Sequence, residues 1–223
     1  IDASGIVANH PKQPKISAMR LGLFGGSFDP VHYGHLLLAE CCREQCMLDR
    51  VLFVPTAAPP HKKGRPLASA DDRVAMLRLA IAGHEPFEAC THEIERGGTS
   101  YTVETLRHFR QTRPDDELFL LVGADMLNDL PNWREAAEIC RLAQPVAVRR
   151  SGLGPIDFAC LESIASAERI AETSRLQVEM PEMGVSSTEV RRRVAEGRSI
   201  RYRTPRAVEE YIRTRGLYRR EVG

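Results

Sequence analysis

The chain has few features that would tie it to a membrane or to nucleic acid. No apolar run in its 223 residues approaches the roughly 18 to 20 that a membrane-spanning helix needs. The first twenty residues lack the apolar centre of a secretory signal. The formal net charge is +1 and aromatic residues make up 6%, so neither overall basicity nor an aromatic platform favours nucleic acid. These absences predict a protein that binds neither nucleic acid nor a membrane.

Cysteines are few and irregularly spaced. Six of them do not form the disulfide framework of a small secreted domain. Cys42 and Cys46 lie one helical turn apart, which leaves a metal pair open, but no second Cys/His pair stands at zinc-finger spacing. We therefore interpret them as reduced thiols of a cytoplasmic protein and assign no side chain to a metal.

Internal repeats and low-complexity tracts are also missing, and the composition of 27% charged and 43% hydrophobic residues is that of an ordinary globular protein. The length fits one domain with an appended subdomain. Charge is distributed less evenly, because residues 191–220 hold eleven arginines and three glutamates. Either something acidic binds near that end, or the arginines form a solvated face.

Short strand-like runs alternate with helical stretches along most of the chain. The predicted strands are Arg20–Phe24, Arg50–Val54, Glu88–Thr91, Leu118–Val122, Pro145–Val148 and Leu176–Glu179. The predicted helices are Gly34–Cys46, Ala70–Ala82, Thr102–Arg110, Trp133–Cys140, Glu189–Glu196 and Arg206–Arg213. This alternation predicts a Rossmann-like α/β fold, a doubly wound parallel sheet, whose ligands bind beyond the carboxyl ends of the strands.

Three segments follow from this pattern. We expect residues 1–19 to be a disordered N-terminal lead and residues 20–185 to form the α/β domain, with an insertion carrying one helix at 151–173. Residues 186–223 would form a small C-terminal helical subdomain.

The stretch from Gly25 to His35, GGSFDPVHYGH, is the most informative part of the sequence. An apolar strand breaks into glycines and a helix begins, which places free backbone N–H groups and a positive dipole end at one point. His32 and His35 flank Gly34, a residue that lets a ligand approach the backbone closely. The combination predicts a phosphate site.

A second helix start carries the same chemistry. Ser186, Ser187, Thr188 and Glu189 form an N-cap cluster after the last predicted strand. Nucleotidyl transfer needs positioned positive charge on phosphate oxygens more than covalent help, and these are suitable parts for it.

The two segments resemble the two signatures of the His-x-Gly-His nucleotidyltransferases, the second as Val185-Ser-Ser-Thr-x-x-Arg191. Further segments are similar to the nicotinate-nucleotide adenylyltransferase family: Pro59–Lys62, Gly97–Thr102, Gly123–Asp125, Leu130–Trp133, Arg198–Tyr202 and Gly216–Tyr218. The resemblance covers about residues 20 to 219. Ser27 departs from it, because the family often has threonine there, but the hydroxyl is kept.

The resemblance implies a role for each matching residue on the ATP side. Adenylate would contact Gly25, Gly26, Ser27 and Phe28, and the ATP phosphates would contact His32 and His35, the catalytic pair. The β- and γ-phosphates would bind Ser187, Thr188 and Arg191, and the ribose would bind Gly123 and Asp125.

On the mononucleotide side, the resemblance implies that Trp133 stacks on the pyridine ring and that backbone amides of Thr102 and Arg134 receive the nicotinate carboxylate. Lys62 would neutralise the phosphate. Other interpretations remain open: a core tryptophan, a solvated lysine, and for Asp125 an ordinary turn residue.

The implied reaction transfers AMP from ATP to nicotinate mononucleotide and forms deamido-NAD and pyrophosphate. The substrate phosphate would attack the α-phosphorus in line, with Mg²⁺ bound through the ATP phosphates. The partners are these small molecules, and a homo-oligomer is left open. Rival interpretations are a pantetheine-phosphate adenylyltransferase or cytidylyltransferase, a nucleotide sensor without turnover, and nucleic-acid binding through the arginine-rich tail. Trp133, the turn at Ser100–Thr102 and the chain length count against both the pantetheine-phosphate adenylyltransferase and the cytidylyltransferase.

Overall fold

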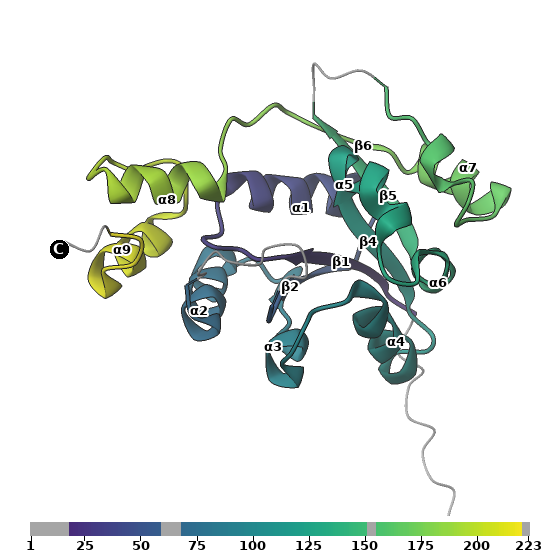
Figure 1. Cartoon of the computed structure of the whole chain (residues 1–223), viewed down its shortest axis with the longest axis horizontal. Helices are drawn as coiled ribbons and strands as arrows, with labels where there is room; N and C mark the ends of the chain where they lie inside the picture. The colour runs from purple at the N-terminus through teal and green to yellow at the C-terminus, as the bar shows by residue number, and fades with distance from the viewer. Residues whose placement is uncertain (1–17, 59–67, 151–154, 220–223) are drawn as a thin grey trace, which may run out of the picture.

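A single sheet of six parallel strands forms the centre of the molecule. The computed structural model describes residues 18–58, 68–150 and 155–219. The strand order is β3-β2-β1-β4-β5-β6 (Figure 1). The strands are β1 (Arg20–Gly26), β2 (Arg50–Pro55), β3 (Phe87–Ala89), β4 (Glu117–Gly123), β5 (Gln144–Arg150) and β6 (Val178–Met180). This is the order of the dinucleotide-binding sheets, and it confirms the predicted doubly wound α/β fold.

Helices cover both faces of the sheet. The described helices are α1 (Tyr33–Gln45), α2 (Ala70–Ile81), α3 (His92–Arg96), α4 (Thr102–Thr112), α5 (Ala124–Asp129), α6 (Ala136–Leu142), α7 (Ala167–Arg175), α8 (Ser187–Ala195) and α9 (Arg206–Arg215). Short 3₁₀ turns add η1 (Leu130–Asn132) and η2 (Ala159–Leu161).

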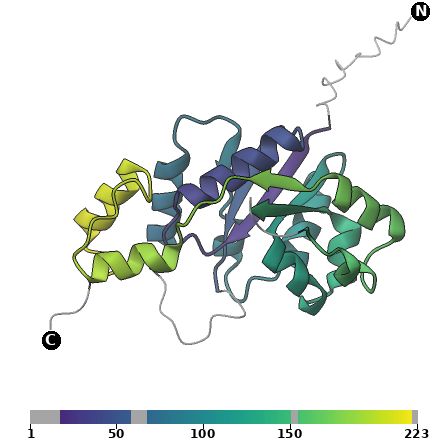
Figure 2. The same cartoon turned by 90° about the horizontal axis from the view of Figure 1, so that it is seen from above.

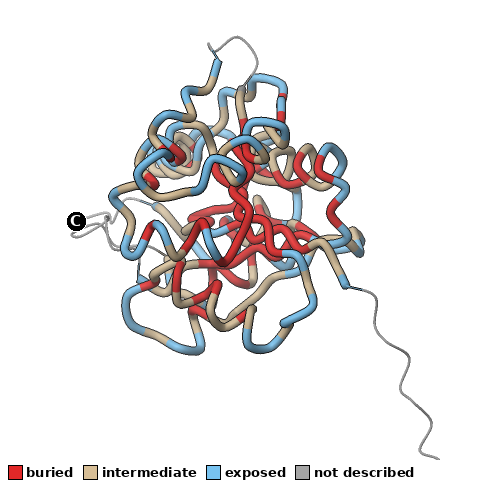
Figure 3. The backbone as a smooth tube through the Cα atoms, turned by 90° about the vertical axis from the view of Figure 1, so that its right-hand side faces the viewer, coloured by how far each residue is buried: buried red, intermediate tan, exposed pale blue. Residues whose placement is uncertain are grey.

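Two hydrophobic cores lie on opposite faces of the sheet, because successive strand residues point to opposite sides. In β4, Phe119 and Leu121 join the core under α1 and α2, whereas Leu118 and Leu120 join the core under α4 and α6. Figure 3 shows these buried residues concentrated in the middle of the molecule. The near-continuous apolar strands of the sequence are therefore buried on both faces.

The order of the strands reverses between β1 and β4. The chain runs from β1 outward to β2 and β3, then crosses back to β4 and continues to β5 and β6. β1 and β4 are directly paired, from Arg20 opposite Glu117 to Leu23 opposite Leu120. Their carboxyl ends thus border the switch point, the place where ligands bind in open α/β sheets.

The C-terminal helices lie together at one end of the molecule, and α7 lies at the other end (Figures 1 and 2). Val208 and Ile212 of α9 are buried in the same core as α1 and α2. The hydroxyl of Tyr211 also donates to Asp72 of α2 over 2.9 Å. The two predicted C-terminal helices are present, and they share a core with the sheet.

Several boundaries differ from the predicted ones. Helix α8 begins at Ser187, two residues earlier than predicted, because Ser186 is its N-cap and accepts from the amide of Glu189 over 3.2 Å. Helix α6 begins at Ala136, three residues later, because Glu135 is left-handed with φ 55°. The short helices α3 and α5 were not predicted. Of the predicted lead, residues 1–17 lie outside the described part, and Met19 already bonds to Asp116 over 2.9 Å.

The arginine-rich end resolves into ion pairs on two helices. Arg192 pairs with Glu189 and Glu196 on α8, and Arg206 pairs with Glu209 on α9, at spacings of three and four residues. Water and salt screen such exposed pairs, so each contributes little to stability. This supports the interpretation as a solvated face, with glutamates as the acidic partners.

The cysteines are free thiols in the described residues. Cys42 and Cys46 are both buried, and burial raises the pKa of Cys46 to about 11. Among the residues that the structure describes, no group of three or more histidine, cysteine or acidic side chains gathers to hold a metal. In the same part of the chain, no helix is long and apolar enough to cross a membrane.

Candidate active site

Strand β1 delivers the first signature to the switch point. Gly25 and Gly26 end the strand, and Gly25 is exposed, with no other atom within 4 Å of the place where a Cβ would stand. A Cβ on Gly26 would lie 3.1 Å from the ring of Phe28. The backbone at this strand end is therefore open on one side and closely packed on the other.

Phe28 turns its ring into the core. Its backbone has φ 46°, and its side chain is 1% exposed. The ring packs edge-on against Phe24 at 5.4 Å and His35 at 5.1 Å between ring centroids. Any contact of Phe28 with an adenylate would therefore come from its backbone, while its ring supports the histidine.

The two histidines form a stacked pair at the start of α1. His32 is the N-cap residue, His35 is the third residue of the helix, and their ring centroids are 3.7 Å apart with planes tilted by 21°. The backbone N–H of His32 donates to Nδ1 of His35 over 3.3 Å. Because an amide can only donate, Nδ1 accepts, and a neutral His35 carries its proton on Nε2. That N–H is a suitable donor to a phosphate oxygen.

Gly34 is needed for this arrangement. A Cβ at this position would lie 3.0 Å from Nδ1 of His32 and 3.5 Å from the carbonyl oxygen of Val185. The second distance shows that the backbones of the two signatures lie close together, because Val185 immediately precedes the N-cap of α8.

Helix α8 begins beside the same loop. The hydroxyl of Ser187 donates to the carbonyl oxygen of Pro30 over 2.8 Å. The amino ends of α1 and α8 therefore meet, and both present partial positive charge to one place. Two helix starts and an imidazole pair form a site for a polyanion.

Arg191 adds a full positive charge at this point. Its side chain is 13% exposed, and its guanidinium donates to Thr188 Oγ1 over 3.0 Å. The same guanidinium bonds to the carbonyl oxygen of Asp29 and approaches its carboxylate at 3.4 Å. Arg191 is thus held between the two signatures.

The end of β4 lies next to the end of β1. Gly123 is the last residue of β4, and Asp125 is exposed in the first turn of α5. A Cβ on Gly123 would stand 2.7 Å from Oδ1 of Asp125, so the glycine lets the carboxylate fold back over the strand end. The predicted ribose-binding pair therefore borders the phosphate site.

The predicted mononucleotide residues come from two adjacent loops. Thr102 is the first residue of α4, where the backbone N–H has no partner within the helix. The guanidinium of Arg134 lies 4.6 Å from the ring centroid of Tyr101 and 3.2 Å from a carboxylate oxygen of Glu104. These contacts bring the segments before α4 and before α6 together.

Trp133 lies in the second of these loops. It is half-buried, and its indole N–H donates to Asp129 over 3.2 Å. One part of the ring packs on the core, and the rest is accessible. Trp133 is thus partly a core residue, and its stacking on a pyridine ring stays a prediction. Lys62 lies outside the described residues.

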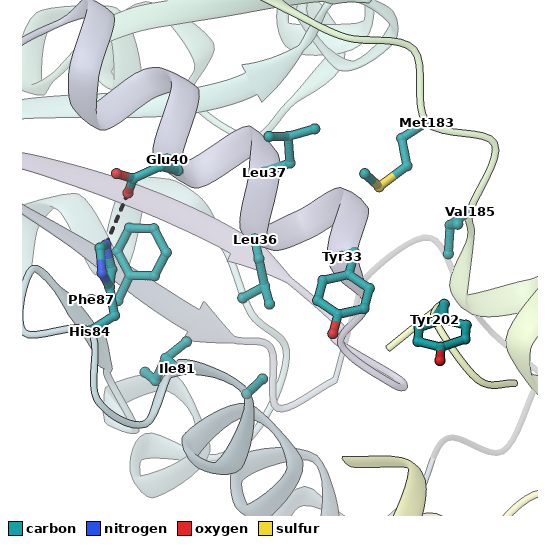
Figure 4. Close-up of a pocket in the computed structure, with 11 residues that line it drawn as sticks. Tyr33, Leu36, Leu37, Glu40, Ile81, His84, Phe87, Met183, Val185 and Tyr202 are labelled. Carbon is teal, nitrogen blue, oxygen red and sulfur yellow. Dashed lines mark hydrogen bonds and ion pairs between the residues drawn. The ribbon is translucent and has the colours of Figure 1, made fainter. Parts of the chain in front are cut away.

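A separate apolar hollow of about 490 Å³ lies along α1 (Figure 4). Its lining is aromatic and aliphatic, apart from the pair formed by His84 and Glu40 at 3.0 Å. Tyr33, the residue that follows His32, lines this hollow. Such a lining does not suit a triphosphate, so we place the nucleotide at the strand ends and not here.

Four residues that reasoning from the sequence missed hold the site together. Asp29 lies within the loop between β1 and α1. The other three bond to that loop: Arg73, Thr204 and Tyr218. Thr204, for example, donates to the carbonyl oxygen of Val31 over 2.8 Å. Asp29 stands inside the first signature and so could have been noticed. The others come from distant segments, and no local pattern links them to this loop, although Tyr218 lies in the family-like segment Gly216–Tyr218.

The fold and the site define a nucleotide-handling α/β protein of the nucleotidyltransferase class. The model of the cytidylyltransferase-like family matches residues 23–193. The chain is 48% identical over 201 residues to a probable nicotinate-nucleotide adenylyltransferase of Thermus thermophilus, covering 90% of this chain and 100% of that protein. It is 44% identical to one described in the same words from Thermomicrobium roseum, covering 90% of this chain and 92% of that protein. The chain belongs to the nicotinate-nucleotide adenylyltransferase family, as the resemblance predicted.

Solved structures agree on the fold. Nicotinic acid mononucleotide adenylyltransferase of Plasmodium falciparum, in complex with NaAD, superposes with a TM-score of 0.68 at 16% identity over 90% of this chain and 97% of that one. A putative nicotinate-nucleotide adenylyltransferase of Vibrio parahaemolyticus gives 0.64 at 19% identity over 90% and 96%. At these identities the likeness concerns the architecture alone.

Proposed function

We propose that the protein transfers AMP from ATP to nicotinate mononucleotide, forming deamido-NAD and pyrophosphate. Membership of the family along nearly the whole chain supports this reaction. The observation that carries it is the meeting of the amino ends of α1 and α8 beside the stacked His32–His35 pair. That meeting lies at the switch point of the sheet, where a nucleotide fits.

The reaction needs alignment and charge stabilisation more than a general base. The phosphate of a mononucleotide is already anionic near neutral pH, so it can attack the α-phosphorus of ATP directly. The Nε2–H of His35 donates to an oxygen of the α-phosphate as negative charge builds up in the transition state. His32 stacks on that ring and holds its orientation.

The leaving pyrophosphate would bind at the amino end of α8. Ser187 and Thr188 occupy the first turn of that helix, and Arg191 follows one turn later. Their backbone N–H groups and the guanidinium would bind the β- and γ-phosphates and stabilise the charge that the leaving group gains. Gly25 and Gly26 allow close approach of the adenylate, and Asp125 beyond Gly123 accepts from the ribose hydroxyls.

Nicotinate mononucleotide would lie between the two adjacent loops. Trp133 stacks on the pyridine ring, the backbone amides of Thr102 and Arg134 receive the carboxylate, and Lys62 neutralises the phosphate. The side chain of Arg134, close to Tyr101, adds positive charge on the carboxylate side. A carboxylate is favoured over a neutral amide by such donors.

Mg²⁺ enters this proposal as a cation carried by the ATP phosphates, and it supplies charge neutralisation there. We assign it no step.

The test is a panel of substrates. With ATP, pyrophosphate release should be fast with nicotinate mononucleotide, slower with nicotinamide mononucleotide and absent with phosphopantetheine. CTP should not replace ATP. Release with phosphopantetheine and none with the pyridine nucleotides would favour the rival adenylyltransferase. ATP binding with no release under any condition would favour a sensor.

A further inference from the structure

Asp29 is fully buried in the loop between β1 and α1, yet three distant segments bond to it. Its Oδ1 accepts from the hydroxyl of Tyr218 over 2.6 Å and from the backbone N–H of Ala68 over 3.2 Å. Its Oδ2 faces the guanidinium of Arg191 at 3.4 Å. A buried carboxylate is costly unless it is fully bonded, so each of these donors matters.

Tyr218 comes from the C-terminal end of the described chain. It follows the left-handed Gly216 that ends α9, and it has φ 62° itself. Burial, together with the bond to Asp29, raises the pKa of its phenol well above the usual value. The phenol therefore keeps its proton and acts as a donor.

Asp29 and a bound triphosphate would compete for the same guanidinium. Tyr218 and Ala68 bond to Oδ1, while Nη1 of Arg191 bonds to the carbonyl oxygen of Asp29 and faces Oδ2 at 3.4 Å. Without the phenol, Oδ1 loses its shortest donor, and the unpaired charge draws Arg191 closer. The guanidinium would then be less available to phosphate.

We propose that Tyr218 is a positioning residue for nucleotidyl transfer, which acts through Asp29 to hold Arg191 available for the β- and γ-phosphates of ATP. The inference rests on the proposed function of the same site. It makes the C-terminal tail, 189 positions from the first signature, part of the ATP site.

Arg73 supports the same loop. It is 2% exposed and donates to the carbonyl oxygens of Ser27 over 2.9 Å and Ala68 over 3.2 Å. Its charge partly offsets the burial of Asp29. The carboxylate itself is oriented by the phenol of Tyr218, the guanidinium of Arg191 and the backbone N–H of Ala68.

Tyr211 provides a matched control. It lies in the same C-terminal part, and its hydroxyl also donates to an aspartate, Asp72, over 2.9 Å. Asp72, however, caps the start of α2 with Ser69, and its ion-pair partner is Arg215 at 3.4 Å. A purely structural role for the tail would make the two tyrosines equivalent.

The experiment compares Tyr218→Phe and Tyr211→Phe with the wild type in thermal unfolding, in ATP binding by calorimetry, and in steady-state kinetics. Both variants should lose stability. Only Tyr218→Phe should raise the Kd and KM for ATP, by about tenfold as expected for one hydrogen bond to a charged group. Its KM for nicotinate mononucleotide should stay unchanged. A double variant with Arg191→Gln should show no further loss of ATP affinity beyond Arg191→Gln alone.

Equal ATP affinity in the two phenylalanine variants would overturn the inference. If the wild type still forms deamido-NAD, the proposed function would stand. A wild type that binds ATP but forms no deamido-NAD would instead overturn the function, and the ATP affinities would still test Tyr218. Should Tyr218→Phe not fold, ¹⁹F NMR of fluorotyrosine-labelled wild type replaces it. The Tyr218 resonance should shift on ATP addition and that of Tyr211 should not; an unmoved Tyr218 resonance would contradict the inference.

Discussion

The hydroxyl of Ser187 donates to the carbonyl oxygen of Pro30 over 2.8 Å, although 157 positions separate the two residues. This bond joins the start of α8 to the loop that leads into α1. It turns two separate helix starts into one site with the histidine pair between them. The predictions below test what each part of that site does.

Replacing His35 by alanine should lower kcat by about 10²- to 10³-fold, because the variant loses a donor that acts on developing charge. The KM for ATP should change much less. His84→Ala is the control, since that ring pairs with Glu40 outside the site. Steady-state kinetics with circular dichroism checks both, and a near-normal kcat in a folded His35→Ala protein would remove His35 from the reaction.

Gly25→Ala separates ligand space from protein packing. No protein atom lies within 4 Å of the added Cβ, so the free energy of unfolding should stay within about 0.5 kcal/mol of the wild type. If adenylate occupies that space, the KM for ATP should rise by about tenfold, the cost of a modest steric clash. Urea unfolding and kinetics measure the two effects, and an unchanged KM would place the nucleotide elsewhere.

Trp133→Ala should raise the KM for nicotinate mononucleotide by about tenfold or more, because stacking on an aromatic ring contributes about 1–3 kcal/mol. Trp133→Phe also loses the indole bond to Asp129 but keeps a ring, so it should retain part of the affinity. The KM for ATP serves as the internal control. Equal losses in both variants would point to the Asp129 bond instead of stacking.

Acid should weaken the docking of α9 through Asp72. A hydrogen bond from Ser69, aided by Tyr211, lowers the pKa of this carboxyl below its ordinary value of 3.8, against the effect of burial. The folded state therefore binds fewer protons, so the stabilisation is complete above that value and is lost as pH falls through the lower folded pKa.

The test compares urea unfolding of wild type and Asp72→Asn at pH 7, 5 and 3. The wild type should be more stable by about 1 kcal/mol at the two higher values. The difference should shrink at pH 3, and a difference that does not change with pH would contradict the assignment.

Local chemistry made much of the site predictable. Glycines after an apolar strand and serines before a helix determine backbone conformation over a few residues, so both helices could be predicted from the sequence, although α1 begins one residue and α8 two residues earlier than predicted. The alternation of strands and helices likewise predicted the parallel sheet, because the connecting helices cover both faces of such a sheet and bury its strands.

Long-range and left-handed features could not be predicted in this way. Tyr218 reaches Asp29 across 189 positions. Both residues lie in segments that resemble the family, but no local pattern pairs one with the other. The ring of Phe28 lies in the core because its backbone is left-handed, a conformation uncommon for a bulky residue. A left-handed Glu135 likewise places Trp133 in a loop and not in a helix.

The most direct test of the proposed reaction is a product analysis with purified protein, ATP, Mg²⁺ and nicotinate mononucleotide. Deamido-NAD and pyrophosphate should form in equal amounts, only when both substrates are present, and the α-phosphate of ATP should appear in the dinucleotide. Pyrophosphate release without deamido-NAD, or no release from this pair while phosphopantetheine is adenylylated, would contradict the account.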